Sequence, residues 1–170
     1  MKQRYPIGEF HYPKEIQESD IRAWIDEISA LPELLKSVVL SLNEVDFEKT
    51  YRDGSWTIRQ LVHHIADSHL NGYIRMKLAL TEENPLVKTY EESEWAKLVD
   101  YNSPLNVSVQ LIESLHSRWT SLLRNLTATQ LKRTYQYPNS SRVRLEQSIA
   151  LYAWHGNHHL AHIKQALNRM

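Results

Sequence analysis

The sequence contains no cysteine and only 4 glycines among its 170 residues. The absence of cysteine excludes disulfide bonds, thiolate metal sites and cysteine nucleophiles. Lysine plus arginine number 20, as do aspartate plus glutamate, so the formal net charge is zero. A chain without excess positive charge has no broad electrostatic reason to bind nucleic acid or an anionic membrane, and we expect neither partner.

Long apolar runs are also missing. The opening segment MKQRYPIGEFHYPKE carries charges and two prolines where a signal peptide would have an apolar stretch. No segment approaches the ~20 apolar residues that a membrane-spanning helix needs. We therefore expect a cytoplasmic protein. Because 42% of the residues are hydrophobic and the length is typical of one domain, we expect residues 1–170 to form a single domain.

Apolar residues instead recur at the helical period over four long segments. These segments run approximately from Ser19 to Leu42, Thr57 to Leu80, Val107 to Leu126 and Leu145 to Asn168. Residues 1–15, with two prolines, predict an extended arm. Residues 46–56 predict a polar loop, residues 81–105 an irregular stretch with one short helix, and residues 132–143 a small hairpin that turns at Pro138-Asn139. The pattern predicts an all-α protein built as a four-helix bundle.

The third helical segment has a predicted core face. At the helical period, this face contains Leu111, Leu115, Trp119 and either Leu122 or Leu123. The opposite face is polar, as expected for a helix that buries one side against its neighbours.

Histidine is abundant, with nine residues, and four of them lie within WHGNHHLAHI in the last helical segment. Residues four apart lie on one face of a helix, so His155 and His159 can aim two imidazoles at one ion about 2.0–2.1 Å away. Relative to the apolar stripe, His159 projects inward, His155 and His162 lie at the edge, and His158 points outward. We predict His155 and His159 as metal ligands, with His162 as a third ligand or a supporting partner.

The second helical segment supplies three further histidines in the run LVHHIADSH. His69 lies nearest the centre of the apolar stripe, His64 lies at its flank, and His63 faces away. Periodicity alone therefore leaves His64 and His69 as equally good candidates for the remaining ligand.

Other catalytic motifs are absent. A zincin needs glutamate directly after its first histidine, whereas Gly156 follows His155. The sequence has no glycine-rich phosphate loop and no GxSxG elbow. These absences argue against zincin, nucleotide-transfer and serine-hydrolase chemistry.

Three motifs occur in an order that resembles a known family. They are YRDGSWTIRQLVHHIADSHLNGYIRMKLALTEENP, LHSRWTSLLRNLT and LYAWHGNHHLAHI, preceded by YPIGEF. Together they resemble the YfiT family of metal-dependent hydrolases, which belongs to the DinB-like superfamily of four-helix metalloproteins. The resemblance covers nearly the whole chain and implies one DinB-like metal-binding domain over residues 1–170.

The resemblance also implies a ligand set. In the family the second of the adjacent histidines in the second helix binds the metal, and that position is His64 here. The last helix contributes the other two ligands, at the positions of His155 and His159. Gly156 and Asn157 depart from many relatives, but neither occupies a ligand position.

Three neutral imidazoles leave a divalent ion with an open coordination position, which is a catalytic rather than a structural pattern. We expect one ion per chain, zinc first and nickel second, and hydrolysis of a small-molecule substrate. Two alternatives stay open: a metal-dependent S-transferase that uses a low-molecular-weight thiol such as bacillithiol, and a non-catalytic helical metal-binding protein. The resemblance further implies a homodimer.

Several other side chains are candidates for the same site. Asp67 lies one turn from His64 and could orient its imidazole, as carboxylates do for many metal-bound histidines. Arg59 and Arg75 are candidates to bind an anionic substrate. Further residues that could line the site are Trp56, His116, Arg118 and Trp119, although an ordinary amphipathic helix explains the last three better.

Overall fold

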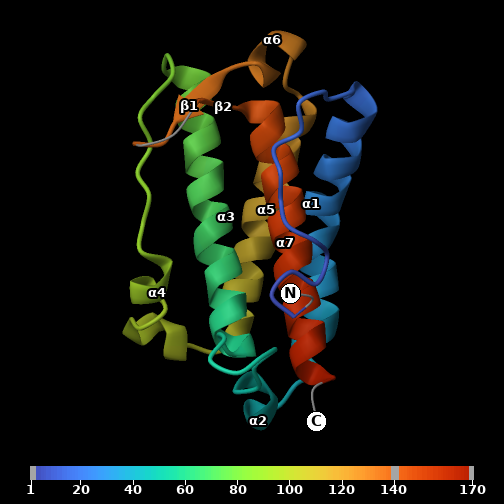
Figure 1. Ribbon diagram of the computed structural model, residues 1–170, viewed down its shortest axis with the longest axis vertical. Coiled ribbons are helices and arrows are strands. Elements are labelled where there is room, and N and C mark those ends of the chain that lie inside the picture. Colours follow the sequence, from blue (N-terminus) through green and yellow to red (C-terminus); the bar gives the residue numbers. More distant parts are fainter. Residues whose placement is uncertain (1–2, 139–141, 169–170) are drawn as a thin grey trace.

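The computed structural model describes residues 3–138 and 142–168, and four long helices dominate it (Figure 1). The long helices are α1 (Glu18–Val39), α3 (Ile58–Thr81), α5 (Leu105–Arg124) and α7 (Leu145–Leu167). Short elements connect them: α2 (Glu44–Phe47), α4 (Glu92–Trp95), the 3-10 helix η1 (Val99–Asn102), α6 (Ala128–Leu131), β1 (Thr134–Gln136) and β2 (Arg142–Arg144). The predicted all-α four-helix bundle is confirmed.

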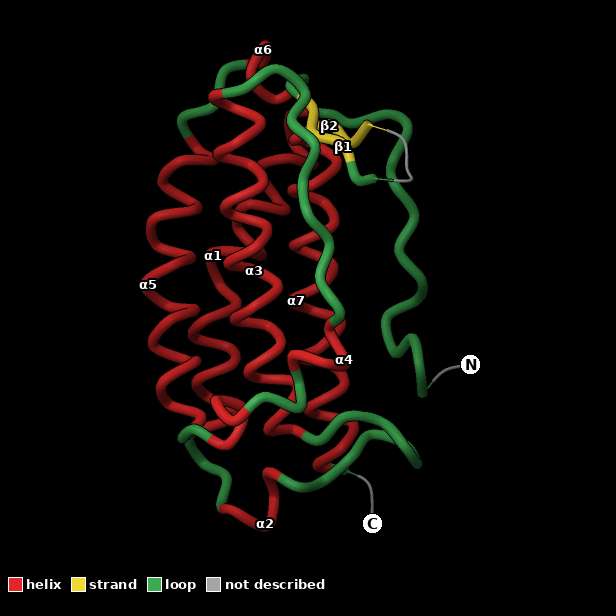
Figure 2. The backbone as a smooth tube through the Cα atoms, turned by 90° about the vertical axis from the view of Figure 1, so that its left-hand side faces the viewer, coloured by secondary structure: helices red, strands yellow, loops and turns green. Residues whose placement is uncertain are grey.

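The order of the helices around the bundle differs from their order in the chain. α1 packs against α5 and α7, and α3 packs against the same two helices, so α1 and α3 occupy opposite corners. α3 and α5 run upward in Figure 1, whereas α1 and α7 run downward. The connection from α3 to α5 must therefore return along the length of the bundle, as Figure 2 shows.

Local sequence signals explain where the elements begin. Thr57 caps α3, because its hydroxyl accepts a hydrogen bond from the Gln60 amide at 3.2 Å while the Gln60 side chain accepts one from the Thr57 amide. The predicted hairpin is present, with β1 and β2 antiparallel and Tyr135 opposite Val143. Its predicted turn includes Asn139, which lies outside the described residues.

Two details differ from the sequence-based expectations. The short helix α2 occupies residues 44–47, at the start of the segment predicted as a loop, because Asn43 caps its first amides. Leu111 is 42% exposed and does not belong to the core face of α5, where Ile112, Leu115 and Leu123 are buried. The buried face is rotated because α5 lies between α1 and α3 and must cover both.

The N-terminal arm lies along α7 (Figure 1). Residues 8–13 have no helix, strand or turn, whereas turns at residues 3–4 and 6–7 replace the extended chain predicted there. The indole nitrogen of Trp154 donates a hydrogen bond to the Gly8 carbonyl at 3.3 Å, and the Gln147 amide donates one to the Pro13 carbonyl at 3.2 Å. Within the described residues, no helix combines the length and apolar character needed to cross a membrane.

The apolar core has two halves. One half, which we call the upper half, includes Ile28, Met76, Trp119 and Ile149, and the other, which we call the lower half, includes Leu35, Leu61, Ile112 and Ile163. Between them lie five histidines, which we call the histidine layer: His64, His69, His116, His155 and His159. A polar layer in the middle of an apolar bundle needs internal hydrogen bonds or a bound ion to offset its lost hydration.

Candidate metal centre

Three histidines of this layer converge on one point. The Nε2 atoms of His64 and His155 lie 3.2 Å apart, and the ring centroid of His159 lies 4.9 Å from that of His64. One ring nitrogen from each of the three lies within 4.8 Å of the others. α3 contributes His64, and α7 contributes His155 and His159 from successive turns. The structure thus brings together the three residues that the family resemblance implies as ligands.

Burial keeps these imidazoles neutral. Desolvation lowers the pKa of His64 from 6.5 to about 4. Desolvation also holds the pKa values of His155 and His159 well below 6.5, with further lowering from neighbouring histidines. A neutral imidazole has a free lone pair at neutral pH, which is the form that binds metals.

A chain of hydrogen bonds determines which nitrogen of His155 is free. The Nδ1 of His116 lies 2.6 Å from the Ile28 carbonyl oxygen, and a carbonyl can only accept, so Nδ1 carries the proton. Its Nε2 must then accept from Nδ1 of His69 at 2.9 Å, and Nε2 of His69 accepts from Nδ1 of His155 at 3.1 Å. His155 is left with a lone pair on Nε2, facing His64.

His162 determines which nitrogen of His159 is free. The Nε2 of His162 donates to the Arg4 carbonyl at 3.1 Å, so its Nδ1 is an acceptor for Nδ1 of His159 at 3.4 Å. His159 therefore keeps its Nε2 lone pair. A second group, His158, His159 and His162, also has nitrogens within 4.8 Å of one another. However, both nitrogens of His162 are engaged, so this group offers fewer free lone pairs.

The donor set fits a divalent cation. The group formed by His64, His155 and His159 has no carboxylate or thiolate member, and the forced tautomer of His155 directs a lone pair at a second imidazole nitrogen 3.2 Å away. Two such nitrogens repel each other unless a proton or a cation lies between them. Zinc prefers imidazole nitrogens in a site of this kind.

The structure distinguishes the two candidates that periodicity left open on α3. His69 is fully buried, and its two nitrogens contact His155 and His116, so it supports a ligand and does not join the group. His63, expected to face away, is also buried, because η1 and the start of α5 cover it. Its Nδ1 lies 2.7 Å from the Ser108 hydroxyl.

The predicted contact between Asp67 and His64 is not present. The Tyr101 hydroxyl donates to Asp67 Oδ2 at 2.8 Å, while the Nδ1 of His64 has no hydrogen-bond partner among the described residues. Asp67 points toward η1, an element that helix periodicity cannot place. Trp56, by contrast, packs on His64 with ring centroids 4.7 Å apart, so it does line the site.

A cavity of about 380 Å³ opens beside the converging histidines. It lies between α3, α7 and the connection that follows α3, and its lining includes Ser68, Arg75, Tyr90, Glu92, Tyr152 and His155. The Ser68 hydroxyl lies 3.4 Å from the Nε2 of His155, so the cavity reaches the candidate metal position. No sequence motif marks Ser68, Tyr90 or Tyr152 as site residues, since tyrosines and serines at these spacings resemble ordinary core or surface residues.

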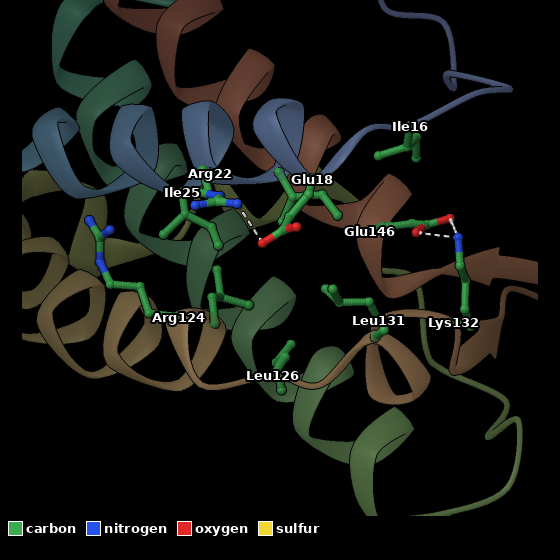
Figure 3. Close-up of a pocket in the computed structure, with 12 residues that line it drawn as sticks. Ile16, Glu18, Arg22, Ile25, Arg124, Leu126, Leu131, Lys132 and Glu146 are labelled. Carbon is green, nitrogen blue, oxygen red and sulfur yellow. Dashed lines mark hydrogen bonds and ion pairs between the residues drawn. The ribbon is translucent and has the colours of Figure 1, made fainter.

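A larger cavity, of about 610 Å³, lies at the α6 end of the bundle (Figure 3). Its wall is mainly apolar, with Ile16, Ile25 and Leu131, and it contains no histidine. The carboxylate of its buried Glu146 is already paired with Lys132 at 2.8 Å and with Arg144 at 2.6 Å. With that charge satisfied, this cavity offers less chemistry than the smaller one.

Comparison with known proteins agrees with this arrangement. A relative from Halalkalibacterium halodurans, named a "putative metal-dependent hydrolase", is 69% identical over 99% of both chains. A relative from Oceanobacillus iheyensis with the same type of name is 53% identical over 99% of this chain and 98% of its own.

Solved structures show the same fold. YfiT from Bacillus subtilis, described as a probable metal-dependent hydrolase with an unusual four-helix bundle topology, superposes with a TM-score of 0.96. It is 42% identical, and the match covers 100% of this chain and 98% of YfiT. A mycothiol-dependent maleylpyruvate isomerase shares only the fold, with a TM-score of 0.67 and 14% identity over 84% of this chain and 60% of its own. The DinB superfamily pattern matches residues 27–163. The chain therefore belongs to the DinB superfamily, and within it to the YfiT family.

Proposed function

We propose that this protein is a metal-dependent hydrolase of a small molecule, with one zinc ion held by His64, His155 and His159. The observation that carries the proposal is the convergence of three neutral imidazoles, without an acidic or thiolate ligand, at the end of a cavity. Zinc in such a site supplies Lewis acidity and makes water a nucleophile at neutral pH. The relatives' names support the same class of reaction.

The protein's own residues position and shield the reactants. The hydrogen-bond chain through His69 and His116 holds His155 with its Nε2 toward His64, and Trp56 packs on the His64 ring. Glu92 is the carboxylate of the cavity lining, and burial raises its pKa. Because Glu92 is the acidic side chain of the described cavity lining, we assign proton transfer to it.

Thiol transfer is the second candidate. An ion held by His64, His155 and His159 would also supply Lewis acidity to a substrate thiol, and the cavity of about 380 Å³ has room for a small thiol. The two reactions differ in their co-substrate. A hydrolase turns over with water alone, whereas a transferase requires added thiol. Cytoplasmic location and homodimer formation stay predictions.

The first test is metal content. We expect the purified, untagged protein to hold near-stoichiometric metal after reconstitution with zinc or nickel, measured by elemental mass spectrometry. Each of His64→Ala, His155→Ala and His159→Ala should lower the metal affinity by more than about 100-fold, the upper end for a residue that only supports a ligand. His158→Ala is the matched control, because it removes a neighbouring buried histidine of the same helix.

The second test is turnover. Small chromogenic esters and alkyl halides are offered to the loaded protein with and without added cysteine or bacillithiol. Hydrolysis without thiol supports the hydrolase, while consumption that depends on thiol supports the transferase. A wild-type protein that binds neither zinc nor nickel would contradict both.

A further inference from the structure

Arg75 lies in the cavity beside the candidate metal centre and has an unusual environment for a charged residue. It is only 8% exposed, and its guanidinium stays protonated at any physiological pH. Among the described residues, no carboxylate oxygen lies within 4.0 Å of it. Burying a charge without a counter-ion is costly, so such a charge is normally paired.

The contacts that Arg75 does make are with neutral groups. Its Nη1 lies 3.3 Å from the Tyr137 hydroxyl and 3.4 Å from the Tyr152 hydroxyl, and its Nη2 donates to the Lys88 carbonyl at 2.7 Å. These bonds leave the Nε–H and one N–H of Nη2 without an acceptor among the described residues. The guanidinium is held in place without a carboxylate in ion-pair contact, and Glu92 on the same cavity wall attracts it from a greater distance.

Another arginine of α3, Arg59, is paired with carboxylates, as charged side chains usually are. Arg59 forms ion pairs with Glu44 at 2.6 Å and with Glu48 at 2.9 Å, and it does not line the cavity. Of the two arginines considered as anion-binding candidates, only Arg75 lines this cavity, and among the described residues only Arg59 has carboxylate partners. Glu92 lines the same cavity as Arg75, but its carboxylate is outside ion-pair distance.

The position of Arg75 relates it to the candidate metal centre. Ser68, which touches His155, and Arg75 are seven residues apart on α3, which places them on the same face with a rise of about 10 Å. Tyr152, which bonds Arg75, precedes His155 by three residues on α7. A close approach of α3 and α7 makes this possible, because a side chain at Gly72 would collide with the Tyr152 ring.

We propose that Arg75 is the anion-recognition residue of this cavity, and that the substrate is a small molecule whose carboxylate lies at Arg75 while its reactive group lies at the metal. The planar guanidinium matches a carboxylate, which accepts two parallel hydrogen bonds from it. The cavity volume of about 380 Å³ admits only a small molecule. This inference deepens the proposed function but concerns a separate binding contact.

Calorimetric titration of the full-length protein tests the proposal. The probes are straight-chain carboxylates from butanoate to octanoate, each compared with its neutral primary amide. We expect at least one carboxylate to bind the wild-type protein more tightly than its amide. Arg75→Gln should weaken that binding by about 10- to 100-fold, the range for hydrogen bonds to a charged group, and Arg75→Lys should weaken it less.

Three controls make the result decisive. Arg59→Gln should leave carboxylate affinity unchanged. His64→Ala, which removes a candidate metal ligand, should retain discrimination between carboxylate and amide; the anion site can thus be confirmed even if the metal proposal fails. Melting temperature and circular dichroism establish whether the Arg75 variants are folded. If Arg75→Gln does not fold, the loss of carboxylate affinity is measured with Arg75→Lys instead. Equal affinity for every carboxylate and its amide, or unchanged affinity in folded Arg75 variants, would overturn the proposal.

Discussion

The histidine layer and the two apolar halves of the core come from the same four helices but depend on different interactions. The apolar halves consist of side chains such as Leu35 and Ile149 that are completely buried and need only shape and volume. In the histidine layer His64, His69 and His116 are similarly buried, while His155 and His159 are partly exposed, and the ring nitrogens need hydrogen-bond partners or an ion. The difference shows that one bundle can separate stability, which the apolar halves supply, from chemistry, which the layer supplies.

The largest effect should come from an apolar half. Leu35→Ala removes a fully buried side chain of α1 and should lower the free energy of unfolding by about 2–5 kcal/mol, the usual range for a buried leucine. Metal content should not change, because Leu35 belongs to the lower half and not to the histidine layer. Urea unfolding and elemental analysis measure the two quantities. If the folded variant loses bound metal as well as stability, the apolar half and the histidine layer are not separable.

A second expectation concerns pH and the metal-free protein. Unfolded histidines take up protons near pH 6.5, whereas desolvation lowers the pKa values of His64 and His116 in the folded protein to about 4. Between these values the unfolded state binds more protons, so stability should fall as the pH falls from 6.5 toward 4.

Protonation of His64 alone should lower the free energy of unfolding by on the order of 3 kcal/mol at pH 4, since a shift of one pKa unit corresponds to ~1.4 kcal/mol. Urea unfolding of the metal-free protein at a series of pH values measures it. The His64→Ala variant should show a shallower pH dependence. Equal slopes for the variant and the wild type would mean that burial does not keep this histidine neutral.

The smallest effect should come from His116, which reaches His155 only through the hydrogen bonds of His69. His116 touches no candidate ligand, but it determines the tautomer of His69 and through it that of His155. His116→Phe keeps a ring in the core and removes both hydrogen bonds, so the affinity for zinc should fall by about 10- to 100-fold. Competition with a chromogenic chelator measures this affinity. The control is Trp119→Phe, which alters a neighbouring ring outside the hydrogen-bond chain and should leave the affinity unchanged.

The amino-acid sequence determined the long helices and two of the three candidate ligands. Apolar residues at the helical period indicated the four long helices, and the spacing of His155 and His159 placed both on one face of α7, because helix geometry is local. Periodicity did not decide between His64 and His69. The family resemblance pointed to His64, and the structure brings His64, not His69, into the group with His155 and His159.

Only the tertiary structure decided which element covers which face. Leu111 is exposed, His63 is buried and Asp67 bonds Tyr101 because α1, α5 and η1 pack where a single-helix pattern cannot place them. The two arginines of α3 look equivalent in the sequence, but Arg59 meets two glutamates near α2, while Arg75 is buried among tyrosines. Helix periodicity gives the direction of a side chain, whereas its partners depend on long-range packing, and those partners decide its charge state and its chemistry.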